Sequence, residues 1–217
     1  MGLEEMNKII LGDVQGISEE IRQQASLLEG KTLLVAGGGG FLGGYFLDVI
    51  SFLNENVLKE KCRLVCLDNF ISGKEDRLAH LGALDYFEFI NHDLAAPFSY
   101  EGDIDFIVHA ASIASPTFYR KYPLQTIEVN ALGTLHLLKL AKEKKVQSFL
   151  YLSSSEIYGD PAPENIPTPE TYWGNVSNVG LRACYDESKR LAETLCMVFS
   201  REYGLPIKIA RPFNVYG

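Results

Sequence analysis

Short apolar runs recur along the chain, each bounded by polar residues, glycine or proline. They cover residues 33–36, 62–69, 86–91, 104–109, 148–153 and 206–210. Such runs predict strands that are buried on both faces of a sheet. Segments with helical spacing lie between them, at 41–50, 124–144 and 183–203. The alternation predicts an α/β fold, a doubly wound parallel sheet with helices on both faces.

Residues 1–30 precede the first predicted strand. Ser18-Glu19-Glu20-Ile21 predicts the start of a helix with acidic residues in its first turn, and Gly30 predicts its end. Three apolar residues of this segment could lie on one face against the body, namely Ile21, Ala25 and Leu28. We therefore expect a helical extension over 1–30 that has no catalytic role, followed by one domain over 31–217.

Composition removes several classes of function. The chain has 217 residues and a formal net charge of −8, which disfavours a nucleic-acid surface. Neither the four cysteines nor the four scattered histidines have the spacing of metal ligands, so we expect no metal and buried free thiols. No signal peptide or membrane-spanning segment is recognisable, and the expectation is a cytoplasmic protein.

The first strand leads into a glycine turn and then a helix. Gly37, Gly40 and Gly43 have the spacing G-x-x-G-x-x-G. A helix that begins after such a turn presents free N–H groups and a positive dipole end, and glycine lets a pyrophosphate approach the backbone. The position between strand and helix favours a nucleotide site over a simple glycine turn.

The second predicted strand ends in Asp68, 25 residues after Gly43. A carboxylate at this place binds the two ribose hydroxyls of a dinucleotide and repels a 2′-phosphate, which favours NAD over NADP. A plain cap of the strand end is the alternative. Further along, Asp93 follows the third strand and could face adenine, and the small residues Ala110, Ala111 and Ser112 would let the backbone pass under the cofactor.

Candidate catalytic groups follow the fifth strand. Ser153, Ser154, Ser155 and Glu156 stand where that strand ends, at the edge that faces the ligand crevice in a doubly wound sheet. Tyr185 and Lys189 are four residues apart in a predicted helix, and therefore share a face. We expect the lysine to lower the pKa of the phenol, so that tyrosine can take the proton of an alcohol while a hydride leaves. A pair on the surface is the alternative.

These motifs occur in the order of a known family. They are Gly37-x-x-Gly40-Phe41-Leu42-Gly43, Asp68-Asn69, Asn91-His92-Asp93, His109-Ala110-Ala111-Ser112, Ser153 to Gly159, Tyr185-x-x-x-Lys189 and Arg211 to Gly217. Together they resemble the extended short-chain dehydrogenase/reductases that act on nucleotide sugars. The resemblance covers residues 31–217 and implies a Rossmann-like, NAD-binding domain.

Within this family the chain most resembles the UDP-glucuronate decarboxylases. The similarity extends through Ala114-Ser115-Pro116, Tyr172 to Val176 and Gly180 to Arg190. Ser155-Glu156 distinguishes the chain from the 4,6-dehydratases, which usually carry Asp-Glu, and from the 4-epimerases, which usually lack the Glu. Two departures stand out: Ala36 replaces the usual Thr, and Gln125 stands where decarboxylases often have a substrate-contacting Lys.

The resemblance, with the placement of the motifs, assigns roles to individual residues. The NAD-binding set is Gly37, Gly40, Phe41, Leu42, Gly43, Asp68, Asn69, Ser72, Asp93, Leu94, Ala110, Ala111, Ser112, Thr126, Ser153, Tyr185, Lys189 and Arg211. The substrate-binding set is Ser115, Pro116, Tyr119, Asn130, Ser154, Glu156, Tyr185 and Asn214. The catalytic set is Ser154, Ser155, Glu156, Tyr185 and Lys189.

The resemblance also implies a reaction and partners. The substrate would be UDP-glucuronate, oxidised at C4, decarboxylated and reduced again to UDP-xylose, and the protein would dimerise through a four-helix bundle of segments 124–144 and 184–203. The family continues beyond the point where Gly217 ends this chain, so we expect most of the substrate domain to be absent and the chain alone to be inactive. A 4-epimerase, a 4,6-dehydratase and an NAD-binding fragment without activity are the alternatives.

Overall fold

A computed structural model describes residues 8–216 and shows one parallel sheet of six strands. The strands are β1 (Thr32–Ala36), β2 (Arg63–Asp68), β3 (Phe87–Asn91), β4 (Phe106–His109), β5 (Ser148–Leu152) and β6 (Ile207–Ala210). Their order across the sheet is β3-β2-β1-β4-β5-β6. The predicted fold class is confirmed, with strand ends displaced by two residues at most. The order of the strands reverses at β1, because β2 and β3 follow on one side of it and β4, β5 and β6 on the other. A doubly wound sheet binds its ligands at this point, between β1 and β4.

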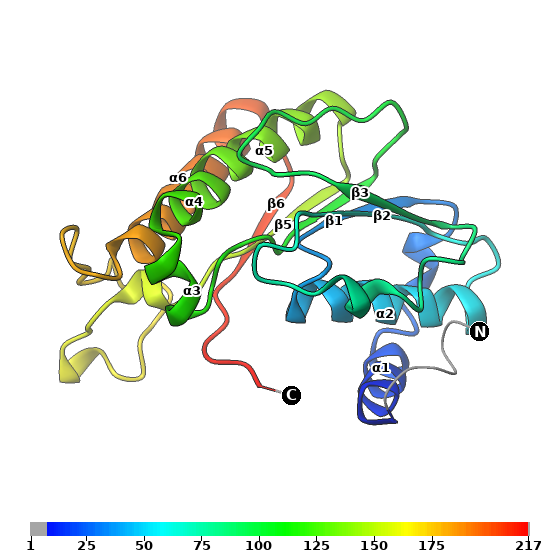
Figure 1. The fold of residues 1–217 in the computed structure, drawn as a ribbon, viewed down its shortest axis with the longest axis horizontal. Coiled ribbons are helices and arrows are strands. Elements are labelled where there is room, and N and C mark those ends of the chain that lie inside the picture. Colours follow the sequence, from blue (N-terminus) through cyan, green and yellow to red (C-terminus); the bar gives the residue numbers. More distant parts are fainter. Residues whose placement is uncertain (1–7, 217) are drawn as a thin grey trace.

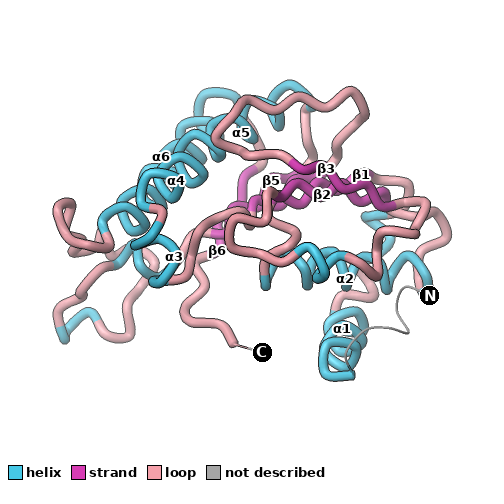
Figure 2. The backbone as a smooth tube through the Cα atoms, in the orientation of Figure 1, coloured by secondary structure: helices cyan, strands magenta, loops and turns pink. Residues whose placement is uncertain are grey.

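Helices cover both faces of the sheet (Figure 1). On one side lies α2 (Phe41–Asn56), with α1 (Lys8–Glu20) packed outside it. On the other lie α4 (Pro123–Glu128), α5 (Thr134–Lys144) and α6 (Ala183–Tyr203), which Figure 2 shows as neighbouring cyan tubes. Short helical segments connect them: η2 (Ala25–Leu28), η3 (Glu75–Leu78), α3 (Pro116–Lys121), η5 (Ser155–Tyr158) and η6 (Pro163–Asn165).

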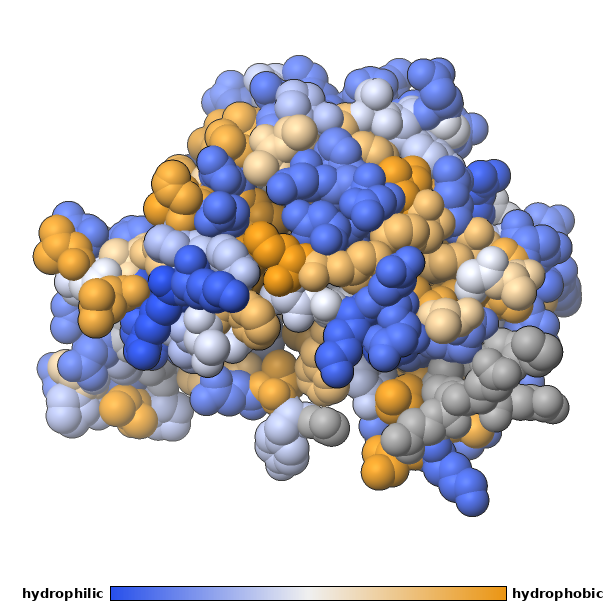
Figure 3. Space-filling view, in the orientation of Figure 1, coloured by the Kyte–Doolittle hydropathy of each residue, from blue (hydrophilic) through white to orange (hydrophobic). Residues whose placement is uncertain are grey.

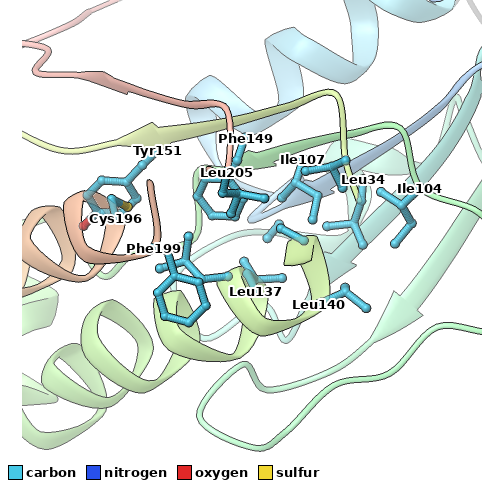
Figure 4. Close-up of a cluster of buried hydrophobic side chains, with 14 of the residues drawn as sticks. Leu34, Ile104, Ile107, Leu137, Leu140, Phe149, Tyr151, Cys196, Phe199 and Leu205 are labelled. Atoms are coloured by element: carbon cyan, nitrogen blue, oxygen red, sulfur yellow. The ribbon is translucent and has the colours of Figure 1, made fainter. Parts of the chain in front are cut away.

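Two apolar clusters hold these layers together. Figure 4 shows one of them, in which Leu34 and Ile107 from the sheet meet Leu137 of α5 and Phe199 of α6. The other cluster packs the opposite sheet face against α2, where Leu47 and Leu53 are fully buried. Burial on both faces explains why the inner strands β1, β2 and β4 are continuous apolar runs rather than alternating ones. The same prediction is wrong for the edge strands β3 and β6, which have exposed positions.

The predicted helix over 124–144 is helical throughout but changes its pitch. A π-helical segment, η4 (Val129–Gly133), separates α4 from α5. Such segments often lie at functional sites. Here it places Val129 against a cavity and leaves Asn130 fully buried.

The prediction for the N-terminal segment is partly wrong. Ser18 to Glu20 forms the last turn of α1, not the start of a helix, and the chain after it makes turns and the short η2. Packing accounts for this, because Val14 is fully buried against α2 and the Tyr45 hydroxyl donates to Asp13 at 2.8 Å. The packing of Ile21, Ala25 and Leu28 against the body is confirmed. The part of the predicted extension at residues 1–7 lies outside the described residues.

Candidate active site

Two adjoining cavities lie where the strands end. The first cavity is lined by the glycine turn, the residues after β2 and β3, and part of α4. The second cavity is lined by the residues after β5, the start of α6 and the segment after β6. Ala110 and Ser112, which follow β4, line both. The two cavities therefore adjoin one another along the carboxyl edge of the sheet.

The glycine turn is shaped for close approach. Gly37 has φ +85°, and a Cβ on it would lie 2.5 Å from the backbone N of Ala111. A Cβ on Gly43, in the first turn of α2, would collide with the Gly37 carbonyl oxygen. Only glycine fits at these two positions, because one requires the left-handed region and the other the contact of helix and turn. The turn thus presents bare backbone to the first cavity.

Asp68 fixes the wall of the first cavity beside this turn. Its carboxylate accepts hydrogen bonds from the backbone N–H of Gly39 at 2.9 Å and of Phe70 at 2.7 Å. The alternative of a strand-end cap is therefore part of the observed geometry. Each oxygen still has a further lone-pair direction, since a carboxylate oxygen can accept two hydrogen bonds. Asp68 lines the cavity and can hold a ribose while it anchors the loop.

Most of the predicted NAD-binding residues meet at these two cavities. Those on the first are Gly37, Gly40, Asp68, Asn69, Ser72, Asp93, Leu94, Ala110, Ala111 and Ser112. Leu42, Ser153, Tyr185 and Lys189 line the second. Gln125, the residue that departs from the decarboxylases, lines the first cavity.

The second cavity gathers the predicted catalytic groups. Ser154 caps η5 by accepting a hydrogen bond from the backbone N–H of Glu156 at 3.2 Å. Tyr185 comes from the first turn of α6 and its ring stacks on Tyr119, with centroids 5.3 Å apart. The predicted residues on this cavity are Pro116, Tyr119, Ser153, Ser154, Ser155, Glu156, Tyr185, Lys189 and Asn214. A hydroxyl, a carboxylate and a phenol therefore face one space.

The expected lowering of the Tyr185 pKa is wrong for the protein without a ligand. Burial raises the pKa of Tyr185, and its hydrogen bond with Ser154 opposes the rise. Lys189 lies on the same helical face, but burial lowers the pKa of its amine to about 7. Its Nζ donates to the Leu152 carbonyl oxygen at 2.7 Å and lies 5.9 Å from the Tyr185 ring centroid. The two pKa shifts have the same cause, because desolvation disfavours the charged form of each group.

Two charged residues that sequence reasoning missed also belong to this region. Arg182 lines the second cavity and forms an ion pair with Glu156. It also lies 3.8 Å from Asp186, whose pKa is raised to about 6 by burial. Arg182 stands three residues before Tyr185, and this helical spacing was the available signal for it.

Six predicted residues line neither cavity. Gly43, Thr126 and Asn130 are buried behind the walls, while Phe41, Ser115 and Arg211 lie outside them. Asn130 donates to the Ser188 hydroxyl at 2.9 Å, and Thr126 donates to the Tyr122 carbonyl at 2.8 Å. Arg211 pairs with Glu193 at 2.7 Å and donates to the Glu170 carbonyl oxygen. The structure therefore does not bring these six residues to the cavity walls.

The donor set fits a dinucleotide. The bare backbone of the glycine turn suits a pyrophosphate, Asp68 suits a ribose, and the buried hydroxyls of Ser112 and Ser153 have no hydrogen-bond partner among the described residues. Residues 8–216 contain no group of three His, Cys, Asp or Glu side chains placed to hold a metal. No helix in the same range is long and apolar enough to span a membrane.

Comparison with known proteins gives a consistent result. Residues 33–217 match the model of the NAD dependent epimerase/dehydratase family. The chain is 44% identical over 185 residues to UDP-glucuronic acid decarboxylase 5 of Arabidopsis thaliana, covering 85% of this chain and 51% of the relative. It is 40% identical over 187 residues to UDP-glucuronic acid decarboxylase 1 of Danio rerio, covering 86% and 42%. The chain thus spans about half the length of the curated relatives it matches.

Solved structures show the same architecture. A UDP-glucose 4-epimerase from Thermotoga maritima, solved with UDP-glucose, aligns with a TM-score of 0.68 at 27% identity, covering 86% of this chain and 56% of that one. A UDP-glucuronic acid 4-epimerase from Bacillus cereus, solved with NAD, aligns with a TM-score of 0.68 at 25% identity, covering 86% and 57%.

Proposed function

Because the chain belongs to the NAD dependent epimerase/dehydratase family, we propose that the first cavity binds NAD and that the second binds the sugar of a nucleotide sugar. The reaction we propose is the decarboxylation of UDP-glucuronate to UDP-xylose. The observation that carries this proposal is the meeting of the glycine turn and the Ser154–Tyr185 pair at two cavities that share Ala110 and Ser112. A dinucleotide lying along both would end beside the phenol.

The residues of the second cavity have distinct roles in this reaction. NAD supplies a hydride acceptor when it is bound. Tyr185 takes the proton of the C4 hydroxyl, and Ser154 shares the hydrogen bond to that oxygen. Lys189, when protonated, stabilises the phenolate and holds the ribose next to it. Its low amine pKa rises as negative charge develops nearby, because an opposite charge favours the protonated form.

Oxidation at C4 makes decarboxylation possible. The resulting sugar is a β-keto acid, and the new carbonyl group accepts the electron pair that the C5–carboxylate bond releases as CO₂ leaves. Loss of CO₂ leaves an enolate, and its protonation at C5 restores the C4 ketone. The hydride taken from C4 in the first step would then return to C4 and reduce the ketone to the alcohol. Glu156 and Ser155 lie on this cavity and are the groups we assign to ring position and to the proton at C5.

The choice of decarboxylation over its alternatives is supported by Ser155-Glu156 and by the similarity to UDP-glucuronic acid decarboxylases. A 4-epimerase is the second candidate, favoured by Gln125 on the first cavity in place of the lysine common in decarboxylases. An epimerase would use the same C4 oxidation but return the hydride to the opposite face of the sugar.

We further propose a homodimer formed by the α4–α6 side of the molecule. Figure 3 shows hydrophobic residues among hydrophilic ones on this flank. The exposed apolar side chains on α4, η4 and α6 are Leu124, Ile127, Leu132, Leu191, Met197 and Val198. Leu138 of α5 is fully buried in the core and is not part of this surface. A cytoplasmic location is proposed because Cys62, Cys66 and Cys196 are buried free thiols.

The test is an assay of the full-length protein with UDP-glucuronate labelled at the carboxyl carbon and, separately, with UDP-glucose. Our proposal predicts labelled CO₂ and UDP-xylose from the first and no reaction of the second. UDP-galacturonate formed without loss of label would support the epimerase instead.

A further inference from the structure

A buried carboxylate in α2 has no place in the reaction described above. Asp48 is fully buried, and its partners come from the segment between β2 and β3. Arg77 of η3 forms an ion pair with Asp48, and His80 Nε2 lies 2.8 Å from Asp48 Oδ1. Since a buried charge is costly unless it is paired, this cluster fixes η3 to α2 in one arrangement.

Gly44 makes room for the cluster. A Cβ on this residue would lie 2.7 to 2.8 Å from the Arg77 guanidinium, and the contacts found for it are with that group. The guanidinium therefore lies against the first turn of α2, directly after the glycine turn. Figure 1 shows the segment after β2 passing beside α2.

The same segment forms one wall of the first cavity. Asn69, Ser72 and Gly73 line that cavity, only a few residues before Arg77. A Cβ on Gly73 would lie 2.8 Å from the Gly39 carbonyl oxygen, so the wall also rests on the glycine turn. Phe70 has φ +54° and its ring stacks on Phe89, with centroids 5.1 Å apart. Such a backbone conformation persists only where its surroundings enforce it.

We propose that Asp48 is a positioning residue that, through Arg77 and His80, holds segment 69–78 in place as a preformed wall of the nucleotide cavity. This inference rests on the proposed NAD site. Asp48 itself makes no contact with the nucleotide in this proposal. It acts on segment 69–78, because a segment that is already fixed loses little conformational freedom when NAD binds, whereas a loosened segment loses more.

Two variants disturb the pairing of Asp48 with Arg77 in different ways. Asp48→Asn keeps the size of the side chain but removes the charge that pairs with Arg77. Gly44→Ala removes no charge, and its methyl group displaces the guanidinium, while alanine by itself favours a helix interior over glycine. Asp13→Asn is the matched control, because Asp13 accepts a hydrogen bond from the Tyr45 hydroxyl of α2, whereas Arg77 and His80 pair with Asp48.

The experiment measures amide hydrogen exchange without ligand and the NAD dissociation constant by calorimetry, with the melting temperature of each variant. The proposal predicts faster exchange across residues 69–78 in Asp48→Asn and Gly44→Ala, with α6 unchanged, and NAD binding weakened about tenfold, on the order of 1.4 kcal/mol. Asp13→Asn matches the wild type in both. Exchange and NAD affinity equal to wild type in both Asp48→Asn and Gly44→Ala would overturn the proposal. If the wild type binds no NAD, the proposed function fails, and the exchange rates still decide the role of Asp48.

Discussion

Lys189 and Tyr185 lie one turn apart on α6, and the Lys189 amine donates to the Leu152 carbonyl oxygen of β5 at 2.7 Å while it lies 5.9 Å from the Tyr185 ring centroid. The lysine therefore links α6 to the end of β5, directly before Ser153 and Ser154. Burial raises the pKa of the phenol and lowers the pKa of the amine to about 7.

Replacement of Tyr185 by phenylalanine tests the base. We expect kcat in the full-length protein to fall by about 10²–10⁴-fold, because the proton acceptor is lost. NAD affinity should change little, since the ring and its stacking on Tyr119 remain. The comparison is Tyr122→Phe, a half-buried tyrosine outside both cavities. Near-normal turnover in Tyr185→Phe would remove the phenol from the mechanism.

The low pKa of Lys189 predicts a pH-dependent stability. The unfolded chain holds the lysine proton between pH 7 and 10.5, whereas the folded protein releases it near pH 7. The free energy of unfolding should therefore rise with pH across this window through Lys189, since the unfolded state binds more protons there. Each unit of pKa difference corresponds to about 1.4 kcal/mol.

Lys189→Met isolates this effect. The variant should be more stable than the wild type near pH 7, and the gap should close toward pH 10.5. Urea unfolding at the two ends of the window measures it, with Lys208→Met at an exposed position of β6 for comparison. A gap that stays constant with pH would contradict the burial of a neutral amine.

Asp68 should select NAD against NADP. In Asp68→Asn the side chain keeps its size but no longer carries the charge that repels a 2′-phosphate. We expect NAD to bind about tenfold more weakly, on the order of 1.4 kcal/mol, and NADP to bind relatively better. Calorimetric titration with both dinucleotides measures the ratio, and Asp103→Asn at an exposed position serves as control. An unchanged ratio would mean that Asp68 is only the cap of its loop.

Gly37 should tolerate no side chain. Gly37→Ala requires a left-handed backbone for alanine and places its Cβ against Ala111, so we expect a loss of at least about 2 kcal/mol in stability. Gly12→Ala in α1 is the matched change, because no atom lies within 4 Å of its Cβ. It should stabilise the helix by up to about 1 kcal/mol. Equal melting temperatures for the two variants would contradict the close packing of the glycine turn.

The sequence predicted what depends on local pattern. Apolar runs such as Leu33 to Ala36 are buried strands because both sheet faces are covered, and the spacing of Tyr185 and Lys189 gave their shared face. The sequence could not predict features that depend on residues far apart in the chain. Asp48 lies inside an apolar helical stretch, and its charge has a meaning only once Arg77 is found beside it.

Two errors have the same origin. The acidic residues at the end of α1 resemble a helix start, but the buried Val14 and the bond of Asp13 to Tyr45 decide where this helix lies. A tyrosine beside a lysine suggests a lowered phenol pKa, but burial of both groups outweighs their attraction. In each case packing across the fold overrides the local signal.

We propose above that the two adjoining cavities hold one NAD along the glycine turn. Titration of NAD into the wild-type protein, followed by amide hydrogen exchange of the complex, tests it most directly. We expect one NAD per chain and slower exchange at Gly37 to Gly43, Asn69 to Gly73 and Ala110 to Ser112. Absence of binding, or protection confined to other segments, would contradict it.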